Sequence, residues 1–186
     1  MAGQQIIQSF RERIEKTVED LRRELGKIRT GRANAAMLDG VQVESYGSRM
    51  PLNAVASITV ADARTLVIKP FDKSQISAIE RAILESDLGI TPQNDGTVVR
   101  LPIPALTEER RKEIAKQVRK KGEDYKIAIR NARRDSNDQV KTLAKDGEIS
   151  DDEEKRLLDQ VQKETDAGIA KIDEVVARKE KEVMEI

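Results

Sequence analysis

The stretch from residue 107 to residue 144 constrains the fold of this chain more than any other. Its apolar and small residues recur at steps of three, four and seven, which average close to the 3.6-residue period of an α-helix. They are Ile114, Val118, Tyr125, Ile129, Ala132, Ser136, Val140 and Leu143. A helix of about 38 residues is roughly 57 Å long, so its apolar line has to be buried along partners of similar length.

Two further stretches supply such partners. Between residues 4 and 28 a heptad recurs, made of Ile7, Ile14, Leu21 and Ile28 with Phe10, Val18 and Leu25 between them. A third helix follows the turn at 146–149, where Ser150 and Glu153 match a capping box. Its expected apolar line is Leu158, Val161, Ile169, Ile172, Val175, Val176 and Val183. Three long amphipathic helices predict an antiparallel three-helix bundle.

The hydrophobic period changes in the middle of the chain. Alternating and β-branched runs there predict strands, and one run has helical spacing. The expected strands are 41–43, 55–60, 66–68 and 97–101, the expected helix is 73–86, and a short helical piece is expected at 33–38. The predicted fold class is therefore α+β with two domains. They are a three-helix bundle of residues 1–30 and 106–186, and an inserted small β/α/β domain of residues 31–105.

We expect the two connections between these domains to act as a hinge. Thr30 and Gly31 end the first helix and begin the first connection, because glycine adopts backbone angles that other residues avoid. Gly31 also fits the pattern of a helix C-terminal glycine. Pro102, Pro104 and Ala105 form the second connection, which proline stiffens locally. Two short connections side by side would let one domain swing relative to the other.

The residue types that are missing argue against several classes of function. The chain has no cysteine and no histidine. Thiolate chemistry, a histidine general base and most zinc or copper sites are therefore not expected. We expect no catalytic residue, no cofactor and no bound metal. No apolar run approaches the ~18 residues of a membrane span and no signal peptide is visible, so we expect a soluble cytoplasmic protein that does not bind membranes. We also expect a monomer.

Charge is sorted along the chain, although the formal net charge is zero. Residues 106–134 carry 11 Lys/Arg against 5 Asp/Glu, whereas residues 146–186 carry 7 against 14. On a helical wheel at about 100° per residue, eight cations of the long helix fall on one side of its apolar line. They are Lys112, Lys116, Arg119, Lys126, Arg130, Arg133, Arg134 and Lys141. Such a basic stripe is shaped for a polyanion, and arginine can bind phosphate through two parallel hydrogen bonds.

Other interpretations of this stripe have to be weighed. A charge run on a long helix is often only a solvated face. A coiled-coil scaffold or chaperone would explain the heptads, but not why the cations lie on one side. Sequence-specific RNA-binding proteins usually stack bases on aromatic side chains, and this chain has only Phe10, Tyr46, Phe71 and Tyr125. We therefore expect recognition of phosphate and shape, with a strong dependence on salt.

Six short motifs, in their order and spacing, resemble the ribosome recycling factor family of bacteria and organelles. They are KIRTGRA at 27–33, DARTL at 62–66, SDLG at 86–89, RLPIPALTEERRK at 100–112, RNARRD at 130–135 and GEISDDE at 147–153. The resemblance covers the whole length of the chain. The lack of an Arg/Ser-rich presequence favours the bacterial type.

The resemblance implies an L-shaped, non-enzymatic translation factor. Such a factor binds the 70S ribosome after termination, with its bundle on large-subunit rRNA. It splits the subunits and frees them from mRNA together with elongation factor G, which hydrolyses GTP. The implied rRNA-binding residues are Arg29, Gly31, Arg32, Arg110, Arg111, Arg130, Arg133 and Arg134. Only the last three belong to the basic stripe.

Two residues, Arg111 and Gly168, invite a structural interpretation. Arg111 falls near the apolar line of the long helix, so it could instead pair with an acid of the third helix. Gly168 lies beside Ile169, where the family commonly has an aromatic residue. We expect a cavity or a local softening of the bundle at Gly168.

Overall fold

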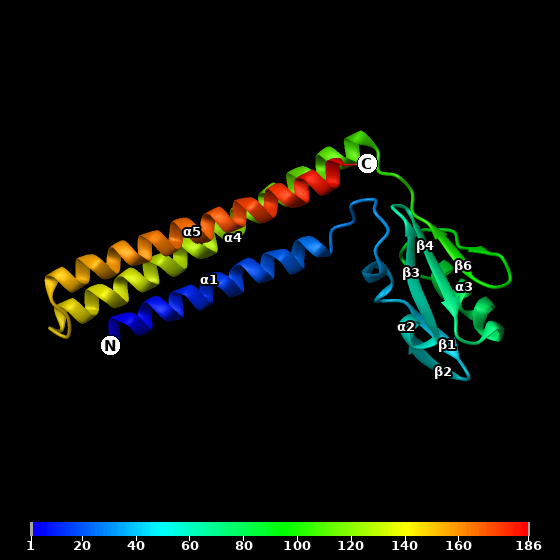
Figure 1. Cartoon of the computed structure of the whole chain (residues 1–186), viewed down its shortest axis with the longest axis horizontal. Coiled ribbons are helices and arrows are strands. Elements are labelled where there is room, and N and C mark those ends of the chain that lie inside the picture. The colour runs from blue at the N-terminus through cyan, green and yellow to red at the C-terminus, as the bar shows by residue number, and fades with distance from the viewer. Residues whose placement is uncertain (1, 186) are drawn as a thin grey trace. The chain divides into compact units, whose positions relative to one another are not determined.

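The computed structural model describes residues 2–185, which form two compact units. One unit contains the residues up to Arg29 and those from Glu108 onward, and the other contains Thr30–Thr107. Figure 1 shows the first as three long helices and the second as a small sheet with short helices. Within the described residues, no helix has the length and apolar character needed to cross a lipid bilayer.

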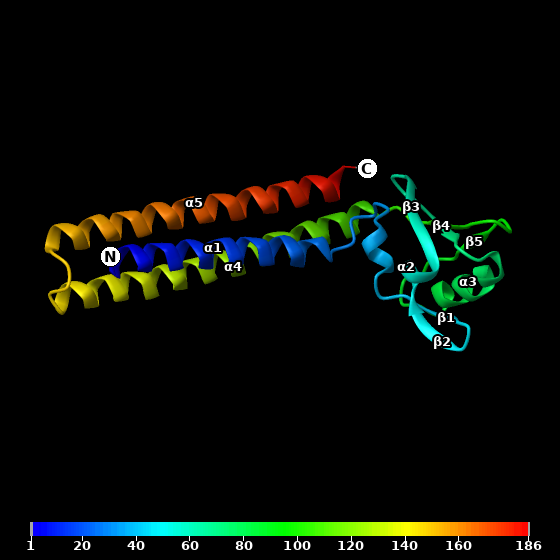
Figure 2. The same cartoon turned by 60° about the horizontal axis from the view of Figure 1, so that its bottom comes forward.

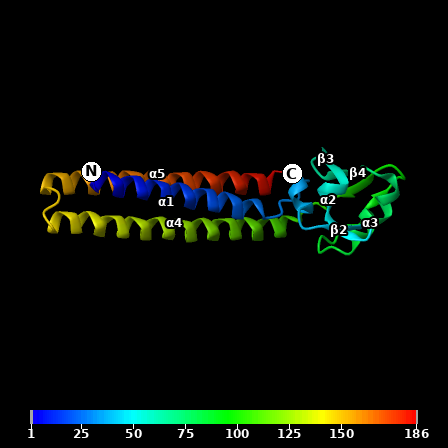
Figure 3. The same cartoon turned by 90° about the horizontal axis from the view of Figure 1, so that it is seen from below.

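The first unit is a bundle of α1 (Ala2–Gly26), α4 (Glu108–Lys145) and α5 (Asp151–Met184). The helix α4 runs antiparallel to α1 and α5, and all three lie side by side in Figures 2 and 3. A tight turn after α4 returns the chain along it. Ser150 begins α5 as its N-cap, because its hydroxyl accepts a hydrogen bond from the Glu153 N–H at 3.2 Å. The α+β class and the three-helix bundle are thus confirmed.

The core of the bundle agrees with most of the predicted apolar lines of α1 and α4, except that Ile28, Tyr125 and Leu143 are only half-buried, and it differs more in α5. The buried residues of α1 include Ile7, Phe10, Ile14, Val18, Leu21 and Leu25, and those of α4 include Ile114, Val118, Ile129, Ala132, Ser136 and Val140. In α5, however, Leu157 is buried rather than Leu158, and Gly168 rather than Ile169. Thr165 is also buried there, and its hydroxyl donates to the Val161 carbonyl oxygen at 2.7 Å.

Two glycines let the helices approach each other closely. A Cβ built on Gly168 of α5 would lie 2.8 Å from Cγ2 of Ile14 and 3.4 Å from Cδ1 of Ile129. The expectation of a cavity at Gly168 is therefore wrong, because side chains of α1 and α4 already fill that space. The space beside Gly122 of α4 is smaller still, since a Cβ built there would lie 2.5 Å from Cγ2 of Val176 on α5.

We expect Gly122→Ala to lower the stability of the bundle. Alanine favours a helix interior over glycine by about 1 kcal/mol, but the new methyl group would overlap Val176. That side chain is β-branched with few rotamers, so relief requires a movement of α5. Overpacking of this kind costs about 1–3 kcal/mol, and a net loss of up to about 2 kcal/mol should appear as a lower melting temperature by circular dichroism.

Gly26→Ala is the matched control for this substitution. Gly26 is the last residue of α1 in the same bundle, and a Cβ there would meet nothing within 4 Å. Its melting temperature should equal or exceed that of the unmodified chain. If Gly122→Ala melts as high as Gly26→Ala, the close approach of α4 and α5 at Gly122 is not a constraint on the fold.

The helix α1 ends earlier than the sequence indicates. Its last residue is Gly26, and the Lys27 N–H closes the final turn on the Glu24 carbonyl oxygen at 3.3 Å. Gly31 has a φ of +76°, which suits glycine, but it lies beyond the helix end. The interpretation of Gly31 as a helix C-terminal glycine is therefore wrong.

The second unit contains a four-stranded antiparallel sheet of order β3-β4-β6-β5 and a separate hairpin of β1 and β2. The strands are β1 (Gln42–Ser45), β2 (Ser48–Pro51), β3 (Ala56–Asp62), β4 (Thr65–Pro70), β5 (Gln93–Asn94) and β6 (Val99–Pro102). The helical pieces are η1 (Ala35–Leu38), α2 (Leu52–Val55), η2 (Lys73–Gln75) and α3 (Ile76–Leu84). The sequence did not predict α2, β2 or β5, because such short elements carry no readable periodicity.

The core of this unit lies between the sheet and α3. It includes Leu66, Ile68, Val99 and Leu101 of the central strands with Ile79 and Ile83 of α3. Both connections to the rest of the chain are tied to the turn between β3 and β4. The Ala33 N–H donates to the Ala63 carbonyl oxygen and the Ile103 N–H to the Arg64 carbonyl oxygen, each at 2.8 Å. The chain therefore enters and leaves this unit at the same turn.

Candidate nucleic-acid interface on the bundle

The outer row of the basic stripe lies on the solvent side of α4. One cation of the stripe, Lys112, pairs with Glu108 one turn earlier at 2.9 Å. The outer row consists of Lys116, Arg130, Arg134 and Lys141, and all four side chains are exposed. None of them forms an ion pair with another residue of the described range 2–185. Because cations without an acid partner keep their full attraction for an external anion, the outer row is available to a polyanion.

The inner row of the stripe consists of Arg119, Lys126 and Arg133, and it faces α5. The Arg119 Nε lies 2.7 Å from Oε1 of Glu180, and this hydrogen bond raises the pKa of Arg119. The Lys126 Nζ lies 2.5 Å from Oδ1 of Asp173, which raises the pKa of Lys126. These two cations are therefore engaged within the bundle.

Arg133, the third cation of the inner row, bonds within residues 2–185 to an amide side chain and not to an acid. Its Nη1 donates to Oε1 of Gln162 at 3.1 Å, and the Gln162 amide donates in turn to Asp166 at 2.9 Å. The side chain is half-buried and its Nε is buried without a hydrogen-bond partner among the described residues. Arg133 thus spans the boundary between the α4–α5 interface and solvent.

The sequence contained a signal for this division that the wheel of α4 alone missed. Arg119, Lys126 and Arg133 recur every seven residues, and so do Asp166, Asp173 and Glu180 on α5. Charges at heptad spacing on two neighbouring antiparallel helices are typical of interhelical salt bridges. The cations of the outer row, which lie further from the apolar line of α4, have no such acids opposite them on α5.

The two arginines at the start of α4 have different surroundings. Arg110 is exposed, and its Nη1 pairs with Oε2 of Glu113 one turn later at 2.7 Å. Arg111 is half-buried, and its Nε is buried without a hydrogen-bond partner within residues 2–185. No acid of α5 forms an ion pair with Arg111 in that range. The alternative of a salt bridge from Arg111 to the third helix is therefore wrong.

The remaining candidate residues lie in the connections. Arg29 is exposed at the end of the first unit, while Thr30 and Gly31 are buried and Arg32 is exposed in the second unit. In the second connection, Pro102 is the last residue of β6 and pairs with Thr65 of β4. Pro104 and Ala105 come directly after Ile103, whose N–H is hydrogen-bonded to the Arg64 carbonyl oxygen, and both are exposed.

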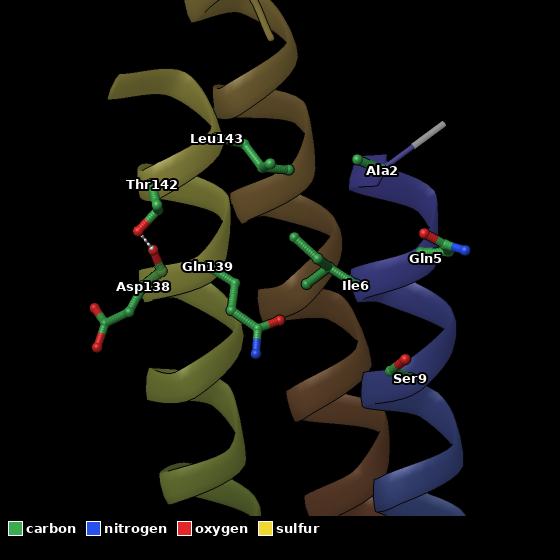
Figure 4. Close-up of a pocket in the computed structure, with 8 residues that line it drawn as sticks. All are labelled: Ala2, Gln5, Ile6, Ser9, Asp138, Gln139, Thr142 and Leu143. Carbon is green, nitrogen blue, oxygen red and sulfur yellow. Dashed lines mark hydrogen bonds between the residues drawn. The ribbon is translucent and has the colours of Figure 1, made fainter. Parts of the chain in front are cut away.

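A shallow groove between α1 and α4 offers no comparable anion site. Figure 4 shows its eight lining residues, which are Ala2, Gln5, Ile6, Ser9, Asp138, Gln139, Thr142 and Leu143. None of them is a cation. The hydrogen bond drawn there runs within α4, from the Thr142 hydroxyl to the Asp138 carbonyl oxygen at 2.9 Å. Among residues 2–185, no group of three or more acidic side chains is placed to hold a metal ion.

Comparison with known proteins gives a consistent result. The sequence profile described as "Ribosome recycling factor" matches residues 21–184. The chain is 56% identical to the ribosome-recycling factor of Geobacillus kaustophilus, over 99% of this chain and 100% of that protein. It is 52% identical to that of Myxococcus xanthus, over 97% of this chain and 98% of that protein.

Two solved structures agree with the sequence relatives. A solution structure of a ribosome recycling factor superposes with a TM-score of 0.75 at 35% identity, covering 100% of this chain and 99% of the other. A second is the T. thermophilus ribosome recycling factor, bound with E. coli elongation factor G to the E. coli post-termination complex. It has a TM-score of 0.63, is 43% identical and covers 100% of both chains. The chain therefore belongs to the ribosome recycling factor family.

Proposed function

We propose that this chain recycles ribosomes after termination of translation. Together with elongation factor G, which hydrolyses GTP, it splits the post-termination complex into subunits and frees them from mRNA. The T. thermophilus relative bound beside elongation factor G on the post-termination complex supports this proposal. The chain itself catalyses no reaction in this process and acts as a monomer in the cytoplasm, where bacterial ribosomes translate.

The outer row of α4 is the observation that carries the proposed contact with large-subunit rRNA. Its four cations are exposed and have no acid partner within residues 2–185. They would bind phosphate oxygens, which fix position without reading sequence. Arg133 would extend this contact from the edge of the α4–α5 interface. By resemblance to the family, we add Arg110 and Arg111 of α4, and Arg29, Gly31 and Arg32 of the first connection.

The connections are proposed as the hinge on which the second unit moves. The hydrogen bonds of Ala33 and Ile103 attach each connection to the β3–β4 turn. The backbone rotation of the hinge is therefore expected in residues before Ala33 and after Ile103. Thr30 and Gly31 precede Ala33, and Pro104 and Ala105 follow Ile103. Pro102 pairs with Thr65 inside the sheet, so we expect it to move with the inserted unit.

An assay of subunit splitting tests this function directly. Post-termination ribosomes are prepared with mRNA and deacylated tRNA, and subunits are measured by light scattering. With this protein, elongation factor G and GTP all present, scattering should fall to the level of free subunits. Omission of any one component, or replacement of GTP by a non-hydrolysable analogue, should leave the ribosomes intact. Splitting that proceeds equally well without the protein would refute the proposal.

A further inference from the structure

Two exposed aromatic residues of the inserted unit are connected through Asp72, apart from the surface assigned above. Tyr46 is 79% exposed and Phe71 is 69% exposed. The Tyr46 hydroxyl donates a hydrogen bond to Oδ2 of Asp72, and Phe71 is the residue before Asp72. This hydrogen bond places the hairpin turn beside the segment that contains Phe71, and we call the region of the two exposed rings the Tyr46–Phe71 patch.

The backbone at Tyr46 is unfavourable for this residue type. Tyr46 and Gly47 have φ values of +49° and +80° and connect the paired residues Ser45 and Ser48. Two-residue hairpin turns with positive φ at both positions favour Asn followed by Gly. Within residues 2–185, Tyr46 is the only non-glycine residue with positive φ. Turn formation therefore does not explain the tyrosine, and strain of this kind is often kept where a side chain has a function.

Two lysines flank Phe71, whereas the hairpin strands next to Tyr46 carry Glu44 opposite Arg49. Lys69 and Lys73 lie two residues before and after Phe71, and both are exposed. Neither forms an ion pair within the described part of the chain. The only acid between them, Asp72, already accepts hydrogen bonds from the Tyr46 hydroxyl and the Ser74 N–H. These hydrogen bonds hold the pKa of Asp72 below its ordinary value. The bond from the Tyr46 hydroxyl is the largest cause.

We propose that the Tyr46–Phe71 patch stacks on unpaired bases of RNA, while Lys69 and Lys73 bind the adjacent phosphates. Aromatic side chains interleaved with cations are the usual platform for single-stranded nucleic acid. A docking surface for a protein is also enriched in aromatic residues but is depleted of lysine at its centre, so Lys69 and Lys73 favour nucleic acid. This site lies on the inserted unit and is additional to the proposed phosphate contacts of the bundle.

Tyrosine fluorescence provides a direct test on the full-length chain. The protein has two tyrosines and no tryptophan, so Tyr125→Phe leaves Tyr46 as the only strong emitter. The probe is a 12-nucleotide oligoadenylate, and an RNA duplex of equal length is the comparison. Stacking should quench Tyr46 emission on addition of the single strand and not of the duplex. Binding of the single strand, seen by anisotropy, without any change in Tyr46 emission would overturn the proposal.

Substitutions separate stacking from a purely structural role of Tyr46. All variants carry Arg130→Ala and Arg134→Ala, so that phosphate contacts of the outer row do not hide the effect. Tyr46→Asn suits the turn but removes the ring, and Phe71→Ala removes the other ring. Each should raise the Kd for the oligonucleotide about fivefold or more, since a base stacked on an aromatic ring contributes this much or more. Tyr46→Phe keeps the ring and should stay within twofold.

Leu84→Ala is the matched control, because Leu84 is 58% exposed on the same unit but is not aromatic. It should leave the Kd unchanged. An equal loss for Tyr46→Phe and Tyr46→Asn, at unchanged melting temperature, would assign the effect to the hydroxyl bond with Asp72 and overturn stacking. If Tyr46→Asn and Phe71→Ala bind the oligonucleotide normally but bind intact ribosomes more weakly, the patch contacts a ribosomal protein and the RNA proposal is wrong.

Discussion

Replacing Arg130 and Arg134 together by alanine is expected to weaken binding to large ribosomal subunits about 30- to 150-fold. Both side chains are exposed and have no ion pair within residues 2–185. Hydrogen bonds to charged groups contribute about 1.5–3 kcal/mol each, and we take about 2–3 kcal/mol for the pair because such effects are not fully additive. Binding by co-sedimentation at several salt concentrations measures both the affinity and its salt dependence. The slope of log K against log salt should become shallower by about two.

The control for this double substitution removes the same charge from another face of the bundle. Arg22→Ala with Arg23→Ala deletes two exposed arginines of α1, each paired with an acid one turn earlier. Exposed pairs of this kind contribute little to stability, so both double variants should melt like the unmodified protein. Arg133→Ala is less suited to the test because Arg133 also bonds to Gln162. Equal weakening by the α1 control would mean that net charge, and not the outer row, attracts the ribosome.

Fixing the inserted unit to the bundle is expected to abolish recycling while leaving ribosome binding within about twofold. The outer row that carries the proposed contact lies entirely within the first unit, so binding does not require the hinge. The chain has no cysteine, which lets two introduced cysteines be bridged without competition. We would place one at Lys27, after the end of α1, and one at Ala63 in the β3–β4 turn. Bis-maleimide bridges of increasing length would then join them.

The same variant without a bridge is the control, and it should split ribosomes at the normal rate. With the shortest bridge that reacts, subunit splitting should fall at least about tenfold, because a hinge transmits force only if its two sides can change their angle. Longer bridges should restore activity in order of length. A tightly bridged protein that still splits ribosomes at the normal rate would show that movement at the connections is not needed.

The sequence predicted the packing of α1 and α4 well and that of α5 poorly, for a physical reason. In α1 the buried positions are mostly large apolar residues, and in α4 buried Ile114, Val118, Ile129 and Val140 keep helical spacing, so both periods can be read directly. In α5 two of the buried positions are Thr165 and Gly168, which carry little hydrophobic signal. Gly168 is buried because it accepts Ile14 of a helix more than 150 residues away in sequence. No local pattern contains that information.

The amino-acid sequence by itself determined the fold class, the family and the sorting of cations to one side of α4, because these depend on residue type and helical period. The periodicity of α4 alone did not determine which of those cations are free to bind, although the heptad of acids on α5 carried a signal for it. In a three-helix bundle, α5 can lie on either side of α4 with the same periodicity in each helix. The tertiary structure places α5 against Arg119, Lys126 and Arg133, beside Glu180, Asp173 and Gln162. Because opposite charges and hydrogen-bond partners meet only there, the handedness of the bundle leaves the outer row without acid partners within residues 2–185.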